Sequence, residues 1–98
     1  MMPVASLKKI QAVIDRLESR SASLSRTDTR RLTEAYVSLS VLRTNQGRLD
    51  LALATIEGAL AVLPESTPLI DSLADIHARY AVLYKEVARR QRASQKRA

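Results

Sequence analysis

Apolar residues recur at intervals of three and four along most of the chain, a spacing that predicts helices rather than strands. The first helix is predicted to begin at Pro3, a residue favoured in a first helical turn, and to end near Arg20. The serine-rich segment 19–28 is predicted to connect it to a second helix. Three residues of this segment are available to cap that helix: Ser25, Thr27 and Asp28.

A helical hairpin is predicted for the middle of the chain. Its first helix ends at residues 45–47, where Gly47 supplies the left-handed backbone conformation of a helix C-terminus. Its second helix runs from about Arg48 to Leu63 and is stopped by Pro64.

The longest predicted helix follows, with Ser66 or Thr67 as its N-cap and Pro68 as its first residue. Its apolar stripe consists of two adjacent seams, each with the alternating spacings of four and three of a heptad pattern. Two interpretations stay open: one seam packs on the hairpin and the other on a partner, or both are buried in a compact four-helix fold. The first seam holds Leu69, Leu73, Ile76, Tyr80, Leu83 and Val87, and the second seam holds Ile70, Ala74, His77, Ala81, Tyr84 and Ala88.

The composition indicates one small helical domain. Of the 98 residues, 46% are hydrophobic but only 3% are aromatic, so aliphatic side chains must fill the core between helices. We expect residues 1–88 to form a single all-α domain and residues 89–98 a basic C-terminal tail. The chain has no cysteine and its beginning lacks the continuous apolar core of a signal peptide, which favours a cytoplasmic protein. No run approaches the ~20 apolar residues that span a bilayer.

Residues 33–66, TEAYVSLSVLRTNQGRLDLALATIEGALAVLPES, have the length of one helix–turn–helix repeat. Small residues would let its two helices approach closely, and larger apolar residues fill the space between them. This order resembles the tetratricopeptide repeat (TPR). The resemblance implies either a four-helix, TPR-like array of helical hairpins or a small bundle, in which a protein or peptide partner is held against the helices. The residues that carry it are Tyr36, Leu39, Ser40, Gly47, Ala52, Ile56, Ala59, Leu60 and Pro64.

Only one repeat is recognisable, and repeats of this kind bury their faces by stacking on neighbours. The flanking helices, or another chain, must therefore cover the hairpin. We expect a homodimer or a heterodimer.

Catalytic chemistry has no support in the sequence. His77 is the only histidine, and neither Asp71 nor Asp75 is aligned with it on a helix, so a packed or interface-edge histidine is favoured over a general base. The acids are spread over the helices without a histidine pair or an acidic loop, and no glycine-rich loop follows a strand. We expect no enzyme activity, no metal and no cofactor.

The net charge of +6 is concentrated at the C-terminal end, where residues 85–98 hold six basic side chains and one acid. Four explanations stay open: a helix C-terminus whose cations complement the helix dipole, an acidic protein partner, nucleic acid, or an anionic membrane surface. The candidate contacts to an anionic partner are Arg89, Arg90, Arg92, Lys96 and Arg97.

The sequence thus predicts a non-enzymatic protein–protein interaction module, an adaptor or small chaperone that binds a helical or extended peptide. The alternative is a dimeric helical protein that associates with nucleic acid through its basic tail, the less favoured partner because no aromatic residues are interleaved with the cations. The residues expected to contact a protein partner are Tyr36, Leu39, Arg43, His77, Tyr80, Tyr84 and Val87.

Overall fold

The computed structural model describes residues 4–97, and in this part of the chain every regular element is a helix, which confirms the all-α prediction. A short 3-10 helix, η1, occupies Ser21–Ser23 in the first connection. The four α-helices are α1 (Val4–Glu18), α2 (Arg26–Asn45), α3 (Leu49–Val62) and α4 (Thr67–Arg97).

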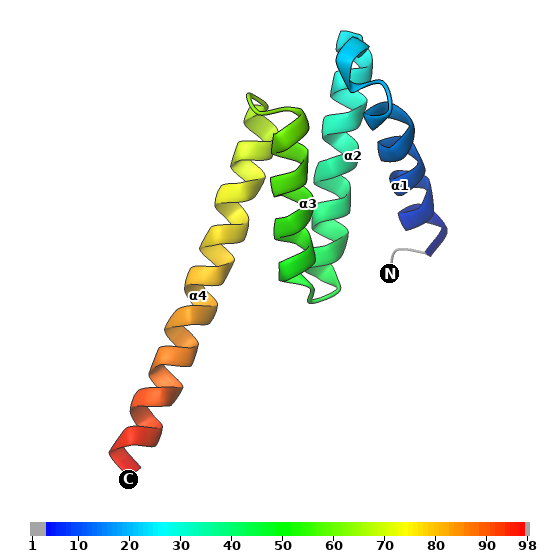
Figure 1. Ribbon diagram of the computed structural model, residues 1–98. Helices are drawn as coiled ribbons and strands as arrows, with labels where there is room; N and C mark the ends of the chain where they lie inside the picture. Colours follow the sequence, from blue (N-terminus) through cyan, green and yellow to red (C-terminus); the bar gives the residue numbers. More distant parts are fainter. Residues whose placement is uncertain (1–3, 98) are drawn as a thin grey trace.

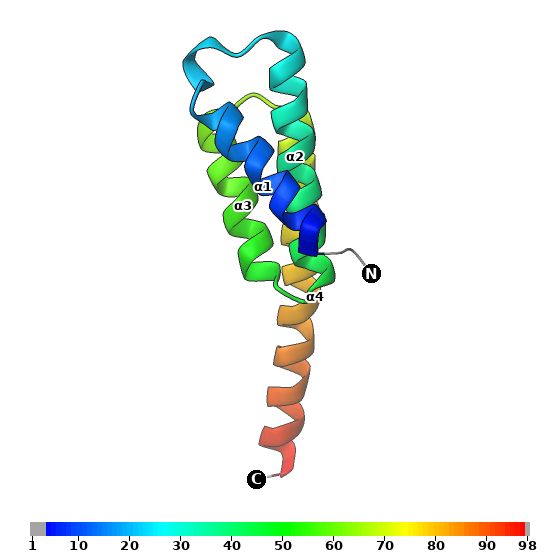
Figure 2. The same cartoon turned by 90° about the vertical axis from the view of Figure 1, so that its right-hand side faces the viewer.

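The α2–α3 hairpin forms the centre of the molecule. In Figure 1 the helices follow one another across the view, with α1 at one end and α4 at the other. Figure 2, turned by 90°, shows α1 in front of the hairpin and α4 behind it. Helix α4 has 31 residues against 14 in α3, so its C-terminal half projects beyond the α2–α3 turn. The Cα atoms consequently span 60 Å along the longest axis of the molecule but only 16 Å along the shortest.

The α2–α3 turn is closed as the sequence predicts. Gly47 has φ +75°, the left-handed conformation that a residue with a side chain rarely adopts. The amide of Gly47 donates to the carbonyl of Thr44 at 3.0 Å, and the amide of Arg48 donates to the carbonyl of Arg43 at 2.9 Å. These bonds satisfy carbonyl groups that the end of α2 leaves without helical partners.

The helix boundaries differ from the sequence predictions by one or two residues where they are described. Ser25 proves to be the N-cap of α2, because its hydroxyl accepts a hydrogen bond from the amide of Asp28 at 3.1 Å. Helix α4 begins at Thr67, one residue before Pro68. The predicted start at Pro3 lies outside the described residues.

The core is continuous through the four α-helices, with α1 packed against α2 and α4 packed against both helices of the hairpin. Its largest completely buried side chains come one from each helix: Leu17, Leu32, Ile56 and Leu69. Ala52 and Ala59 of α3 are also fully buried, and Ala59 lines a small hollow together with Tyr36 and Leu39 of α2. Both small residues are thus interior positions of the hairpin.

The two seams of α4 have different environments. Leu69 and Ile76 of the first seam are buried against the hairpin, whereas Ile70 and Tyr84 of the second seam are 46% and 69% exposed. The interpretation that both seams are buried in one compact fold is therefore wrong for the single chain. The reason is geometric: α2 and α3 contact only one side of α4, and its projecting half passes beyond both of them.

Candidate functional site

Two of the predicted partner contacts are core residues. Tyr36 is 3% exposed and Leu39 is 6% exposed, which corrects the expectation that they are available on the surface. The Tyr36 hydroxyl donates a hydrogen bond to the carboxylate of Glu18 and so ties α2 to the end of α1. Burial, together with this hydrogen bond and the nearby negative charge of Glu18, raises the pKa of Tyr36 well above its usual value.

The predicted contacts on α4, from His77 to Val87, follow one another along the helix. The rings of Tyr80 and Tyr84 stack with centroids 5.9 Å apart and an angle of 22° between their planes. Tyr80 is half-buried against the core, whereas Tyr84 and Val87 are exposed. His77 is exposed as well, so it is not a packed histidine within the chain.

Arg43 lies on another element, in the last turn of α2, where it is half-buried. Within residues 4–97, no cluster of three or more His, Cys, Asp or Glu side chains could hold a metal ion.

The basic residues at the C-terminal end belong to α4, which continues without a break past Ala88 to Arg97. The carboxylate of Glu86 accepts hydrogen bonds from Arg89, at 2.6 Å, and from Arg90, at 3.2 Å. The bond from Arg89 is the main reason why the pKa of Glu86 lies below its usual value. Arg92 and Lys96 are exposed, and the side chain of Arg97 lies outside the described part. Two of the predicted anion contacts are therefore already bonded to a carboxylate of their own helix.

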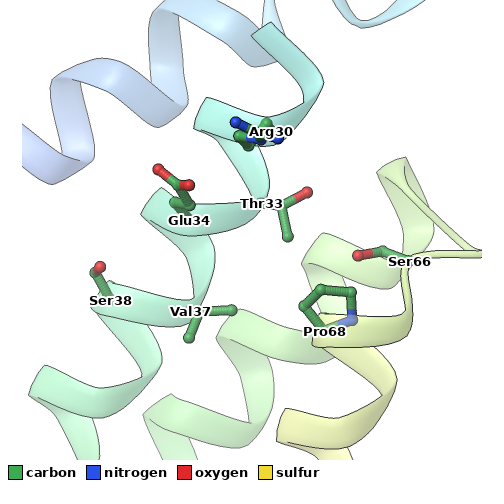
Figure 3. Close-up of a pocket in the computed structure, with 7 residues that line it drawn as sticks. All are labelled: Arg30, Thr33, Glu34, Val37, Ser38, Ser66 and Pro68. Atoms are coloured by element: carbon green, nitrogen blue, oxygen red, sulfur yellow. The ribbon is translucent and has the colours of Figure 1, made fainter. Parts of the chain in front are cut away.

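A surface that the sequence analysis missed runs along α2. A hollow of about 460 Å³ lies between α2 and the beginning of α4, and Figure 3 shows Val37 of α2 pointing toward Pro68 of α4 there. A second hollow, of about 400 Å³, lies between α1 and α2 and shares Glu34 and Ser38 with the first. A third, of about 90 Å³, lies farther along between α2 and α4 and includes Val41. We call these three hollows together the α2 trough, because α2 contributes to each of them and α1 or α4 lies on the other side.

The α2 trough is cationic and partly apolar. Its lining contains five basic side chains and only two carboxylates. Val41, on the floor, is 50% exposed. The trough cannot be found from the sequence, because its cationic residues belong to three helices and are separated by up to seventy positions along the chain. They are Lys9, Arg16, Arg30, Arg31 and Arg79, against Glu34 and Asp75.

Comparison with protein-family models, with curated proteins and with solved structures gives no match for this chain. The TPR resemblance therefore rests on residues 33–66 themselves. Among the described helices, none has the length and apolar character needed to cross a bilayer.

Proposed function

We propose that the protein is a non-enzymatic interaction module, of the adaptor or small-chaperone kind, whose α2 trough binds an acidic, extended segment of a partner protein. The observation that supports this best is the excess of cations around an exposed apolar floor, open along α2. Cations at the rim attract an acidic segment, and apolar side chains on the floor bury its apolar residues.

The length of the trough suits a short peptide. Helix α2 has 20 residues. At a rise of ~1.5 Å per residue such a helix is ~30 Å long. An extended chain advances by ~3.3 Å per residue, so about nine residues of a partner fit along it.

Most of the binding energy is expected from a few positions. Val41 would lose its exposed apolar surface on binding, a gain of at most about 1.5 to 3 kcal/mol for a completely buried valine. Arg30 and Arg31 are exposed near one end of α2 and can donate charge-assisted hydrogen bonds to carboxylates. The TPR resemblance of the hairpin supports the same function, because it implies peptide binding against the helices.

The second candidate is a nucleic-acid-associated dimer. It is supported by Arg92 and Lys96, which are exposed on the projecting end of α4. It is less favoured because Arg89 and Arg90 already form ion pairs with the carboxylate of Glu86. In addition, residues 85–98 contain no aromatic side chain that could stack on a base.

A random-peptide display library tests the main proposal. Sequences selected by the wild type are synthesised, and their affinities are measured by fluorescence anisotropy. We expect acidic peptides to be enriched, and we expect Arg31→Glu or Val41→Glu to weaken their binding by about tenfold or more. Ala61→Glu adds the same negative charge as Val41→Glu at an exposed position of α3 outside the trough and serves as the control.

The outcomes separate the two candidates. Selection of no acidic peptide, or equal binding by the trough variants and the control, would contradict the peptide-binding function. A duplex DNA probe that binds with a steep dependence on salt, and that loses affinity in Arg92→Glu rather than in Arg31→Glu, would favour the nucleic-acid function instead.

A further inference from the structure

The second seam of α4 is a continuous surface that the chain itself leaves uncovered. Its six positions, 70 to 88, have heptad spacing and extend along the packed half of α4 as well as along its projecting half. None of them is buried. At ~1.5 Å per residue the seam is ~27 Å long, enough for several layers of contact with another helix.

The residue types along this seam alternate strictly in size. When the heptad is counted from Ala74, its first position always holds alanine and its fourth position always holds a larger side chain. Helices that pair in parallel place like positions opposite each other, so alanine would face alanine and tyrosine would face tyrosine. An antiparallel pair places each small residue opposite a large one and fills every layer evenly. The small residues are Ala74, Ala81 and Ala88, and the large ones are Ile70, His77 and Tyr84.

The charges of α4 favour the same orientation. Near its beginning the helix carries Asp71 and Asp75, whereas residues 85–97 hold six basic residues and one acid. Two parallel copies would bring these basic ends together. Two antiparallel copies place the acidic part of each helix beside the basic part of the other, which reduces repulsion and adds attraction across the contact.

We infer that a second copy of this chain docks antiparallel on the second seam of α4. In the register that overlays the whole seam, Ile70 faces Ala88 of the partner subunit and Ala74 faces Tyr84 of the partner subunit. Beside these layers, Asp71 lies next to Lys85 of the partner subunit. The inference is separate from the peptide-binding function, because the residues of α4 that line the α2 trough (Pro68, Ser72, Asp75, Ile76 and Arg79) lie outside the second seam.

Disulfide formation tests the orientation, since the chain contains no cysteine. Ala74→Cys is combined with Tyr84→Cys in one chain, where the two positions are ten residues, or ~15 Å, apart along the helix and cannot be bridged within it. Under mild oxidation the double variant should form a covalent dimer, and an equal mixture of the two single variants should do the same. Each single variant alone should stay uncrosslinked. Crosslinking of Ala74→Cys alone would indicate a parallel pair and overturn the inference, as would the absence of crosslinking in both the double variant and the mixture.

Sedimentation equilibrium tests the surface independently of any cysteine. The wild type should have twice the chain mass of 10.9 kDa, and Ala81→Glu should have the mass of a single chain while its circular dichroism stays helical. Ala93→Glu, an exposed position of α4 off the seam, should remain a dimer. A monomeric wild type, or a dimeric Ala81→Glu, would overturn the inference.

A charge exchange tests the register. Asp71→Lys and Lys85→Asp should each raise the dimer dissociation constant about threefold to tenfold, because each places two like charges side by side. The double variant should return to the wild-type value. Two single effects that add up in the double variant would show that these residues do not face each other.

Discussion

The hydroxyl of Tyr36 on α2 donates a hydrogen bond to the carboxylate of Glu18, the last residue of α1. Tyr36 is buried, and its hydroxyl lies at the edge of the core where α1 meets the hairpin. The contact fixes α1 as one wall of the α2 trough, so it connects the packing of the core to the proposed binding surface.

Tyr36→Phe should lower the free energy of unfolding by about 1 kcal/mol, since a hydrogen bond to a charged group is lost but the exposed carboxylate of Glu18 can bond to water instead. Urea unfolding measures the change. Tyr84→Phe, at an exposed tyrosine whose hydroxyl makes no hydrogen bond within the described part of the chain, is the matched control and should have little effect. Equal effects of the two substitutions would contradict a stabilising role for the Glu18 contact.

Alkaline pH should destabilise the fold through the same residue. The pKa of Tyr36 is raised in the folded state, chiefly by burial, so the folded state holds the proton more tightly than the unfolded chain. This contribution is complete below the unfolded pKa of ~10 and is lost as the pH rises above it. The difference in unfolding free energy between the wild type and Tyr36→Phe should therefore shrink above pH ~10. A difference that stays constant through this range would refute the linkage.

Gly47→Val should cost about 1 to 3 kcal/mol, the usual penalty for a side chain held at positive φ. A Cβ atom at Gly47 would meet no atom within 4 Å, so the cost is one of backbone conformation and not of crowding. Gly58→Ala is the control: Gly58 lies within α3, a Cβ there also meets nothing within 4 Å, and the change should stabilise the helix by about 0.5 to 1 kcal/mol. Thermal unfolding of both variants checks the prediction, and an unchanged melting temperature for Gly47→Val would contradict it.

The helices and the turn at Gly47 could be predicted because they depend on neighbouring residues: the period of the apolar positions, and glycine after the last helical turn. The buried position of Tyr36 and its hydrogen bond to Glu18 could not be predicted from the sequence. An aromatic residue on the apolar face of a helix has the same sequence spacing whether it fills the core or contacts a partner. Only the three-dimensional structure, which places Tyr36 beside Glu18 of α1, distinguishes the two cases. The α2 trough needs three helices to assemble, so no segment of the sequence contains its signal.

Ala59→Leu tests the close approach of α2 and α3. Ala59 is completely buried, so three added carbon atoms must displace the neighbouring side chains of α2 and should cost about 1 to 3 kcal/mol by overpacking. Ala61→Leu adds the same atoms two residues later, at an exposed position, and should change the stability little. If urea unfolding shows a neutral effect at Ala59, the hairpin does not have the tight contact that the TPR resemblance implies.

Changing Tyr84 and Val87 together to Glu should abolish self-association without unfolding the chain. Tyr84 lies on the second seam of α4 and Val87 on the first seam; Tyr84 is 69% exposed and Val87 is 49% exposed. In the dimer the new charges would be buried without partners, which is costly. In the separated chain the same charges face water.

The matched control for this double change is Val82→Glu, which places a charge at a 66% exposed position of the same projecting segment but off the second seam. It should leave the dimer intact. Sedimentation equilibrium reports the association, and circular dichroism reports the helices. Because neither Tyr84 nor Val87 belongs to the hydrophobic core, the double variant should sediment as a single chain and melt as a folded one. Loss of helical structure in that variant would instead place both residues in the interior of the fold and remove α4 as the contact surface.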